Sequence, residues 1–142
     1  MSITSANSVY TLSIDTIFPQ PVTLQKYAVD DAFTTTVLRV GEVQMGVDGQ
    51  MSGGFTFVEI PQEISFIADS PSVLIFDQWW QAELQAKDVY PATGTIQLPS
   101  TKTKWSMTNG ILVSYSPIPD AKRVLQPRRF GITWQSAVSQ PI

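Results

Sequence analysis

Alternating apolar and polar positions near the start of the chain predict a strand. Tyr10, Leu12 and Ile14 alternate with Thr11 and other polar residues, which is the period-2 pattern of a half-buried strand. Two prolines, at positions 19 and 21, are expected to break the chain after it. Similar apolar runs predict further short strands over residues 22–27, 64–68, 95–98, 104–107, 111–115 and 129–135.

Between the first strands lies a segment that predicts a long β-hairpin. Residues 33–45 are rich in Thr and Val, and residues 55–60 return as the partner strand. Glycines at both ends of the intervening segment predict a loose tip without a core of its own. The expected tip consists of Gly46, Val47, Asp48, Gly49, Gln50, Met51, Ser52, Gly53 and Gly54.

A single helix is predicted from Ser70 to about Asp88. Ser70 suits the N-cap position, and Pro71 suits the first helical turn, where its missing N–H costs nothing. The residues expected to form the core-facing stripe follow at spacings of three and four; they are Val73, Phe76, Trp80 and Leu84. Ile75 and Trp79 widen the apolar arc, so they are expected either under a second layer or at a subunit contact.

The dipeptide Asn109-Gly110 lies between two apolar runs. Asn-Gly is the strongest short signal for a two-residue hairpin turn, so a tight hairpin is predicted there. Together these elements predict one mostly-β domain over residues 1–142 (α+β, with one flanking α-helix and a long β-hairpin). No repeat and no linker divides it.

Composition excludes much of the usual catalytic chemistry. The chain has 142 residues with no Cys and no His, which removes thiol nucleophiles, disulfides, the commonest metal ligand and every Ser-His triad. Charged residues make up only 15%, against about 25% in an average soluble domain. A sparsely charged surface favours a protein covered by repeated subunit contacts, although an ordinary Thr-, Ser- and Gln-rich β-sandwich has the same composition. No signal peptide or membrane span is expected.

Charge is distributed unevenly along the chain. Residues 1–88 carry eleven acids and three basic residues, whereas residues 89–142 carry one acid and six basic residues. Two parts of opposite charge favour association between copies of the chain, unless folding mixes their charges on one surface. The basic residues concentrated near the C-terminal end, and expected at a subunit interface with Ile75 and Trp79, are Lys122, Arg123, Arg128 and Arg129.

Candidate sites for chemistry are weak. The adjacent Asp30 and Asp31 are expected in a turn, and with Asp48 they match no known calcium loop. The glycines of the hairpin tip lack the Lys and Ser/Thr of a phosphate loop. Trp105 or Trp134 would serve a carbohydrate-binding β-sandwich as a stacking platform, but core or interface packing is the commoner use of Trp. We therefore expect no enzymatic activity, no cofactor and no metal.

The order of these elements resembles the tail tube protein of contractile-tailed bacteriophages. The resembling features are the long hairpin, the Ser-Pro-Ser helix with its Trp pair, and the later segments Gly94–Pro99, Asn109-Gly110 and Arg129–Trp134. The resemblance implies a β-sandwich or barrel with a flanking helix, assembled into hexameric rings that stack into a tube. It implies that the hairpin tip reaches the neighbouring ring.

The same resemblance implies partners and location. A tail tube subunit contacts the tail sheath, the baseplate and tail-end proteins, is assembled in the host cytoplasm, and becomes part of the virion tail. Double-stranded DNA passes through its lumen during genome ejection without specific binding, past a wall that is usually acidic. Tube initiators and terminators at the baseplate or neck share the fold and remain an alternative function.

Overall fold

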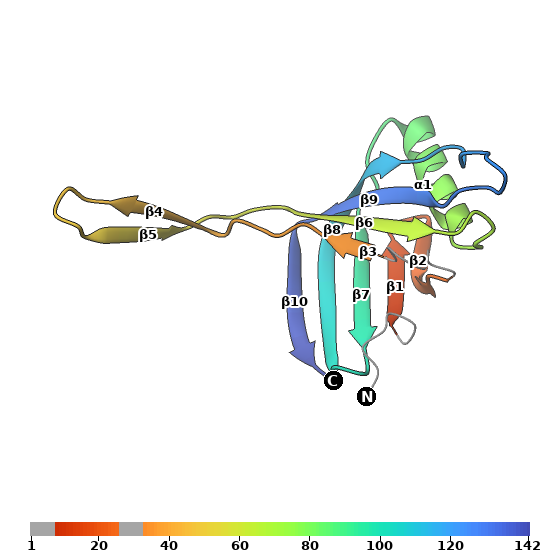
Figure 1. Cartoon of the computed structure of the whole chain (residues 1–142). Coiled ribbons are helices and arrows are strands. Elements are labelled where there is room, and N and C mark those ends of the chain that lie inside the picture. The colour runs from red at the N-terminus through yellow and green to blue at the C-terminus, as the bar shows by residue number, and fades with distance from the viewer. Residues whose placement is uncertain (1–7, 26–32) are drawn as a thin grey trace.

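The computed structural model describes residues 8–25 and 33–142, which form ten strands and one helix. The predicted mostly-β architecture with one helix is confirmed (Figure 1). The strands are β1 (Val9–Ile14), β2 (Phe18–Thr23), β3 (Phe33–Thr35), β4 (Gly41–Met45), β5 (Met51–Phe55), β6 (Ile60–Phe66), β7 (Ala92–Leu98), β8 (Thr103–Tyr115), β9 (Arg128–Trp134) and β10 (Ser136–Pro141). The helix α1 spans Val73–Ala86.

Strand β8 joins two layers of one antiparallel sheet. The strand order is β2-β1-β7-β8-β9-β6-β3, with β10 also paired to β8. Residues 103–108 of β8 pair with β10 on one side and with β7 on the other, whereas residues 111–115 pair with β9. The strands of the two layers run in clearly different directions, and α1 covers one end (Figure 1). The apolar core is enclosed between these parts.

The core draws on both layers and on the helix. Its buried members include the alternating apolar residues that the sequence predicted in β1 and β9. Phe76 of α1 stacks on Phe130 of β9, with ring centroids 4.5 Å apart. The side chains without measurable exposure include Tyr10, Leu12, Ile14, Ile64, Phe66, Phe76, Trp79, Phe130 and Ile132.

The helix is rotated relative to the prediction. Trp79, expected on an outer flank, has no exposed surface and donates a hydrogen bond from Nε1 to the Tyr90 carbonyl (2.9 Å). Trp80, expected in the core, is 37% exposed and stacks on Tyr115 with parallel rings 5.1 Å apart. Of the two alternatives for Trp79, the subunit contact is therefore wrong and burial under a second layer is right, because burying Phe76 beneath the sheet turns Trp79 inward with it.

The start of the helix also differs. Ser72, not Ser70, is the N-cap residue, and its side chain makes no capping bond. Both serines instead bind the backbone of Gln25: the Ser72 hydroxyl accepts from the Gln25 N–H (2.7 Å), and the Ser70 hydroxyl donates to the Gln25 carbonyl (2.5 Å). The helix ends at Ala86, followed by Lys87 in the left-handed conformation, which is close to the predicted end.

The Asn-Gly pair does not form a hairpin. Strand β8 runs through it without reversing, and the real β7–β8 turn lies at Pro99–Lys102. Asn109 has φ of 52°, and the β7–β8 register shifts beside Gly110. A Cβ on Gly110 would lie 2.5 Å from the Trp134 ring. The glycine is therefore required by close packing, and the left-handed asparagine by a bulge.

Several strand boundaries were predicted wrongly. Pro19 and Pro21 lie inside β2, which is an edge strand where a missing N–H is tolerated, and Pro61 lies inside β6. Strand β10 was not predicted, because its sequence, SAVSQP, has only one large apolar residue. The predicted strand over 22–27 begins inside β2, but residues 26–27 lie outside the described residues, as do Asp30 and Asp31.

Candidate assembly surfaces

The predicted long hairpin exists, and it stands apart from the rest of the protein. We call residues 36–59 the arm. The arm leaves the sheet between β3 and β6 and extends well away from it (Figure 1). Every residue of β4 and β5 is exposed. The strands of the arm therefore do not pack against the described core.

The tip of the arm is smaller and better defined than the sequence indicated. Strands β4 and β5 pair in register from Gly41↔Phe55 to Met45↔Met51. The turn is closed by a hydrogen bond from the Gly46 N–H to the Gln50 carbonyl (2.7 Å). The Asp48 carboxylate accepts from the Gln50 N–H (3.1 Å). Gly53 and Gly54 thus belong to a strand and not to a loose tip.

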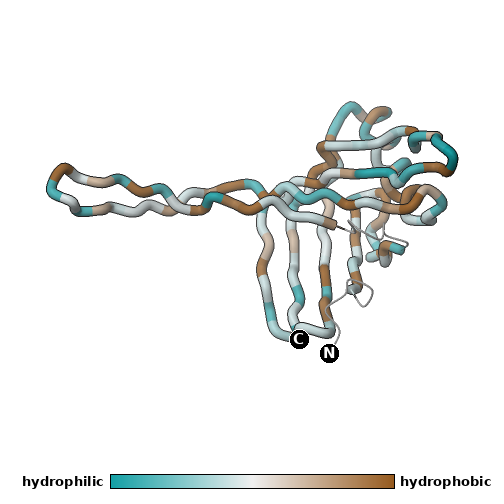
Figure 2. The backbone as a smooth tube through the Cα atoms, in the orientation of Figure 1, coloured by the Kyte–Doolittle hydropathy of each residue, from teal (hydrophilic) through white to brown (hydrophobic). Residues whose placement is uncertain are grey.

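One face of the arm is apolar. Residues directly opposite each other in an antiparallel pair share a face. The pairs Val43↔Gly53, Met45↔Met51 and Gly41↔Phe55 therefore put Val43, Met45, Met51 and Phe55 together on one side. Glu42, Gln44 and Ser52 lie on the other side. Hydrophobic segments recur along the whole arm (Figure 2).

These apolar side chains are uncovered. Phe55 is 75% exposed, and Val47 at the turn is more exposed than in an extended reference chain (110%). Phe57 packs edge-on against Phe55, with ring centroids 4.9 Å apart, and is otherwise open. A contiguous apolar surface of this kind marks a site of protein–protein contact.

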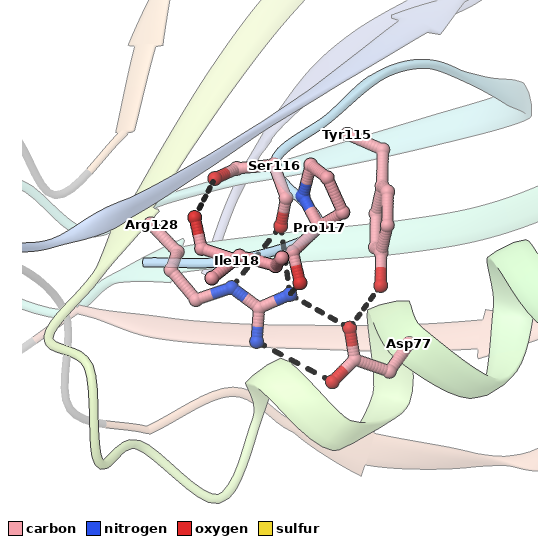
Figure 3. A network of polar contacts seen from close by, with 6 residues as sticks. All are labelled: Asp77, Tyr115, Ser116, Pro117, Ile118 and Arg128. Carbon is pink, nitrogen blue, oxygen red and sulfur yellow. Dashed lines mark hydrogen bonds and ion pairs between the residues drawn. The ribbon is translucent and has the colours of Figure 1, made fainter. Parts of the chain in front are cut away.

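Arg128 belongs to a buried network within the protomer (Figure 3). Its guanidinium donates from Nη2 to Asp77 Oδ1 (2.7 Å) and from Nη1 to Asp77 Oδ2 (3.3 Å). It also donates to the Ser116 carbonyl (2.7 Å) and lies over the Phe130 ring, 5.2 Å from the centroid. The Tyr115 hydroxyl donates to the same Asp77 carboxylate. Only 5% of Arg128 is exposed.

The prediction that Arg128 pairs with another subunit is therefore wrong. Its partner, Asp77, lies 51 positions away on α1, and the pair fastens the helix to β9 and to the segment after β8. Arg129 is exposed and forms an ion pair with Glu63 of β6 (2.8 Å) in the same protomer. Lys122 and Arg123 are exposed on the segment between β8 and β9, so their role at a subunit contact stays a proposal.

This network makes stability depend on acid pH. Burial alone raises the pKa of the Asp77 carboxyl, but hydrogen bonds from Arg128 and Tyr115 and the charge of Arg128 outweigh it and hold the pKa below its ordinary value. The stabilisation is then complete above the unfolded pKa of about 3.9 and is lost as pH falls through the lower folded pKa.

We expect the free energy of unfolding to fall as pH drops below about 4, and the Asp77→Asn variant to lose part of that dependence. Urea denaturation at a series of pH values from neutral to acid measures both proteins. Identical pH profiles for the variant and the unmodified protein would contradict this role of Asp77.

A second exposed apolar surface lies on the helix. Leu74, Trp80 and Leu84 are exposed to 58%, 37% and 58%. Ile75, by contrast, is partly buried against the core. The helix surface that is available for a subunit contact is therefore centred on Leu74 and Leu84 rather than on Ile75 and Trp79.

The residues considered for sugar binding do not form a platform. Trp134 is 1% exposed, and its indole N–H donates to the buried Gln62 side chain (3.1 Å). Trp105 is partly buried and lines a cavity with Trp134. Among the described residues, no group of three or more acidic, Cys or His side chains is placed to hold a metal ion. Within residues 8–25 and 33–142, no helix is both long enough and apolar enough to cross a membrane.

A comparison of the sequence with models of known protein families assigns this chain to one of them. A family profile described as "Tail fiber protein gp32" matches residues 1–138. The chain belongs to this family. A comparison with curated protein sequences finds no match.

Solved structures agree with this family at the level of the fold. The chain is similar to a protein of the sheath-tube complex of the PVC extracellular contractile injection system, with a TM-score of 0.64 at 10% identity over 94% of this chain and 88% of that one. It is similar to the tube-terminating cap of the anti-feeding prophage, with a TM-score of 0.61 at 14% identity over 100% and 93%. It is also similar to a protein of the baseplate of that prophage, with a TM-score of 0.57 at 16% identity over 99% and 97%.

These matches confirm the resemblance to tail tube proteins of contractile systems. Family and fold together identify the gp32-family chain as a structural protein of a phage tail or a related contractile injection system. The matched structures include tube, cap and baseplate proteins, so the fold is common to several positions in such assemblies.

Proposed function

We propose that the chain is a tail tube subunit that forms hexameric rings, stacked around a lumen that conducts DNA. The observation that carries this proposal is the arm, whose exposed apolar face is covered by none of the other described residues of its protomer. An extended amphipathic ribbon of this kind is unstable in water by itself and gains stability when another subunit covers it. In a stack of rings, the next ring provides that cover.

The surface that we propose for the lumen carries few charges. Strand alternation turns Thr11, Thr95, Gln97 and Ser106 toward solvent on the layer formed by β1, β7, β8 and β10. The described residues of this face carry Lys104 as their charged side chain. A wall of hydroxyls and amides offers phosphates few strong contacts. DNA passage without specific binding would then rest on the small number of charges on this wall, whereas the resemblance implied an acidic wall.

Several partner surfaces follow from the proposal. The helix residues Leu74 and Leu84 are exposed and would contact the tail sheath. The exposed Lys122 and Arg123 would contribute to contacts between neighbouring subunits of a ring. Exposed charge pairs contribute only about 0–1 kcal/mol each, so the apolar arm supplies the larger part of the assembly energy.

The proposal predicts strong self-association. Sedimentation velocity of the purified protein should show species much larger than the 15.7 kDa protomer. The species should persist in high salt, because apolar burial is not screened. A monomer at high protein concentration would contradict the proposal.

A cap or terminator at one end of the tube is the second candidate. The tube-terminating cap of the anti-feeding prophage matches the whole of this chain. A terminator would form a ring that stops growing, whereas a tube subunit stacks without limit. The two functions therefore differ in the length of the particles and not in the fold.

A further inference from the structure

The two layers of the sheet leave an apolar cavity open at the base of the arm. It has a volume of about 310 Å³. Its walls include Phe33 and Ile60, where the arm begins and ends, and Leu98, Trp105, Met107 and Ala137 on the facing layer. Among the described residues, no ionisable side chain lines it. A volume of this size would hold about ten water molecules against mostly apolar walls.

The polar group in the cavity is already bonded. The Gln62 side-chain oxygen accepts hydrogen bonds from the Tyr10 hydroxyl (2.6 Å) and from Trp134 Nε1 (3.1 Å). Its amide nitrogen donates to the Thr35 hydroxyl (3.3 Å). The Gln62 side chain is therefore already hydrogen-bonded when an occupant enters the cavity. The remaining walls favour apolar groups.

The apolar face of the arm has the matching chemistry. We propose that the cavity of one copy receives this face, centred on Met45 and Met51, from the arm of a second copy. The inference rests on the proposed tube function and names the receiving site for the arm. Methionine side chains are flexible and fill irregular apolar spaces well.

The occupant comes from another copy, because the arm of the same copy points away from the cavity. The arm begins and ends next to the cavity residues Phe33 and Ile60, and it extends away from the sheet (Figure 1). Residues 36–47, at about 3.3 Å per residue, reach up to about 40 Å from there. A patch at one end of a molecule that fits a pocket at the other makes a head-to-tail contact, which repeats into an open stack.

Charge complementarity supports the same pairing. The arm carries Glu42, Asp48 and Glu59 against Arg39, so its balance is acidic. The turn between β7 and β8, which directly follows the cavity residue Leu98, carries Lys102 and no acid. An acidic arm approaching a basic rim is steered toward the cavity, while the apolar contact itself remains free of charge.

Filling the cavity tests the proposal. The Ala137→Phe variant adds an aromatic ring inside the mouth, whereas the matched control Val138→Phe adds the same ring to the opposite face of β10, where Val138 is 53% exposed. Both variants should keep the circular dichroism of the unmodified protein. Electron microscopy should show that Ala137→Phe no longer stacks and that Val138→Phe still does.

Crosslinking locates the contact directly, because the chain has no cysteine. The double variant Met51→Cys/Ala137→Cys, assembled and treated with a short bismaleimide, should give a ladder of covalent multimers. Gln44→Cys/Ala137→Cys, on the polar face of the arm, should give much less. Equal ladders from both, or normal tubes from Ala137→Phe, would overturn the cavity as receptor and leave the tube function standing. Failure of the unmodified protein to stack would overturn both.

Discussion

Replacing Arg128 with Met should lower the free energy of unfolding by about 3 to 5 kcal/mol. The substitution leaves the Asp77 carboxylate without its bidentate partner and leaves the Ser116 carbonyl without its donor. It also removes the contact of the guanidinium with the Phe130 ring. The Asp77 carboxylate would keep the Tyr115 hydroxyl as a donor but lose its counter-charge, and a partly buried charge without a counter-charge is expensive, which accounts for most of the loss.

Arg129 supplies the matched control. It follows Arg128 directly and also forms an ion pair, with Glu63, but both side chains of this pair are about half exposed or more. Arg129→Met should therefore change the free energy of unfolding by no more than about 1 kcal/mol. Urea denaturation measures both variants. Equal losses for the two arginines would contradict the distinction between a buried network and a surface pair.

Shortening the arm should have the opposite profile, with little effect on folding and a complete effect on assembly. Replacing residues 43–53 with Asn-Gly joins the paired residues Glu42 and Gly54 through a two-residue turn. The melting temperature should change little, because the removed residues are exposed and contact no core residue. Sedimentation should show that large assemblies are lost.

A less drastic variant separates the apolar face from arm length. Val43→Ser/Met45→Ser/Met51→Ser keeps the arm and removes its apolar side chains, and it should also fail to stack. Gln44→Thr/Ser52→Thr changes the polar face and should assemble normally. Assembly by the triple variant would mean that the apolar face is not what another subunit covers.

Much of the fold was predictable because local patterns dominate it. Period-2 alternation correctly predicted the buried faces of β1 and β9, and spacing with capping signals correctly located the helix to within a few residues. The long hairpin also followed from its composition. These features depend on residues close together in the sequence, so sequence patterns can predict them.

The errors arose where contacts between residues far apart in the sequence determine the local structure. Trp79 and Trp80 are adjacent in a wide apolar arc, and contacts made after folding separate them: Trp79 is buried and bonds to the Tyr90 carbonyl, whereas Trp80 stacks on Tyr115. Asn109-Gly110 has a strong turn signal, but the Trp134 ring needs the space above the glycine. Arg128 sits in a basic cluster, and nothing near it in sequence indicates Asp77, 51 positions earlier.

The candidate contact surface was predicted in location but not in form. The sequence indicated Gly46–Gly54 as a flexible tip, whereas the structure shows a paired ribbon with a turn at Gly46–Gln50. The segregation of Val43, Met45, Met51 and Phe55 onto one face depends on strand register. A one-residue change in register would have mixed these side chains with Glu42 and Gln44.

Electron microscopy of the purified, unmodified protein tests the central claim most directly. We predict long hollow tubes built from stacked rings with sixfold symmetry. Single rings that do not grow would favour a cap or terminator. Particles of protomer size at high protein concentration would contradict the claim that the uncovered arm drives this chain into a tube.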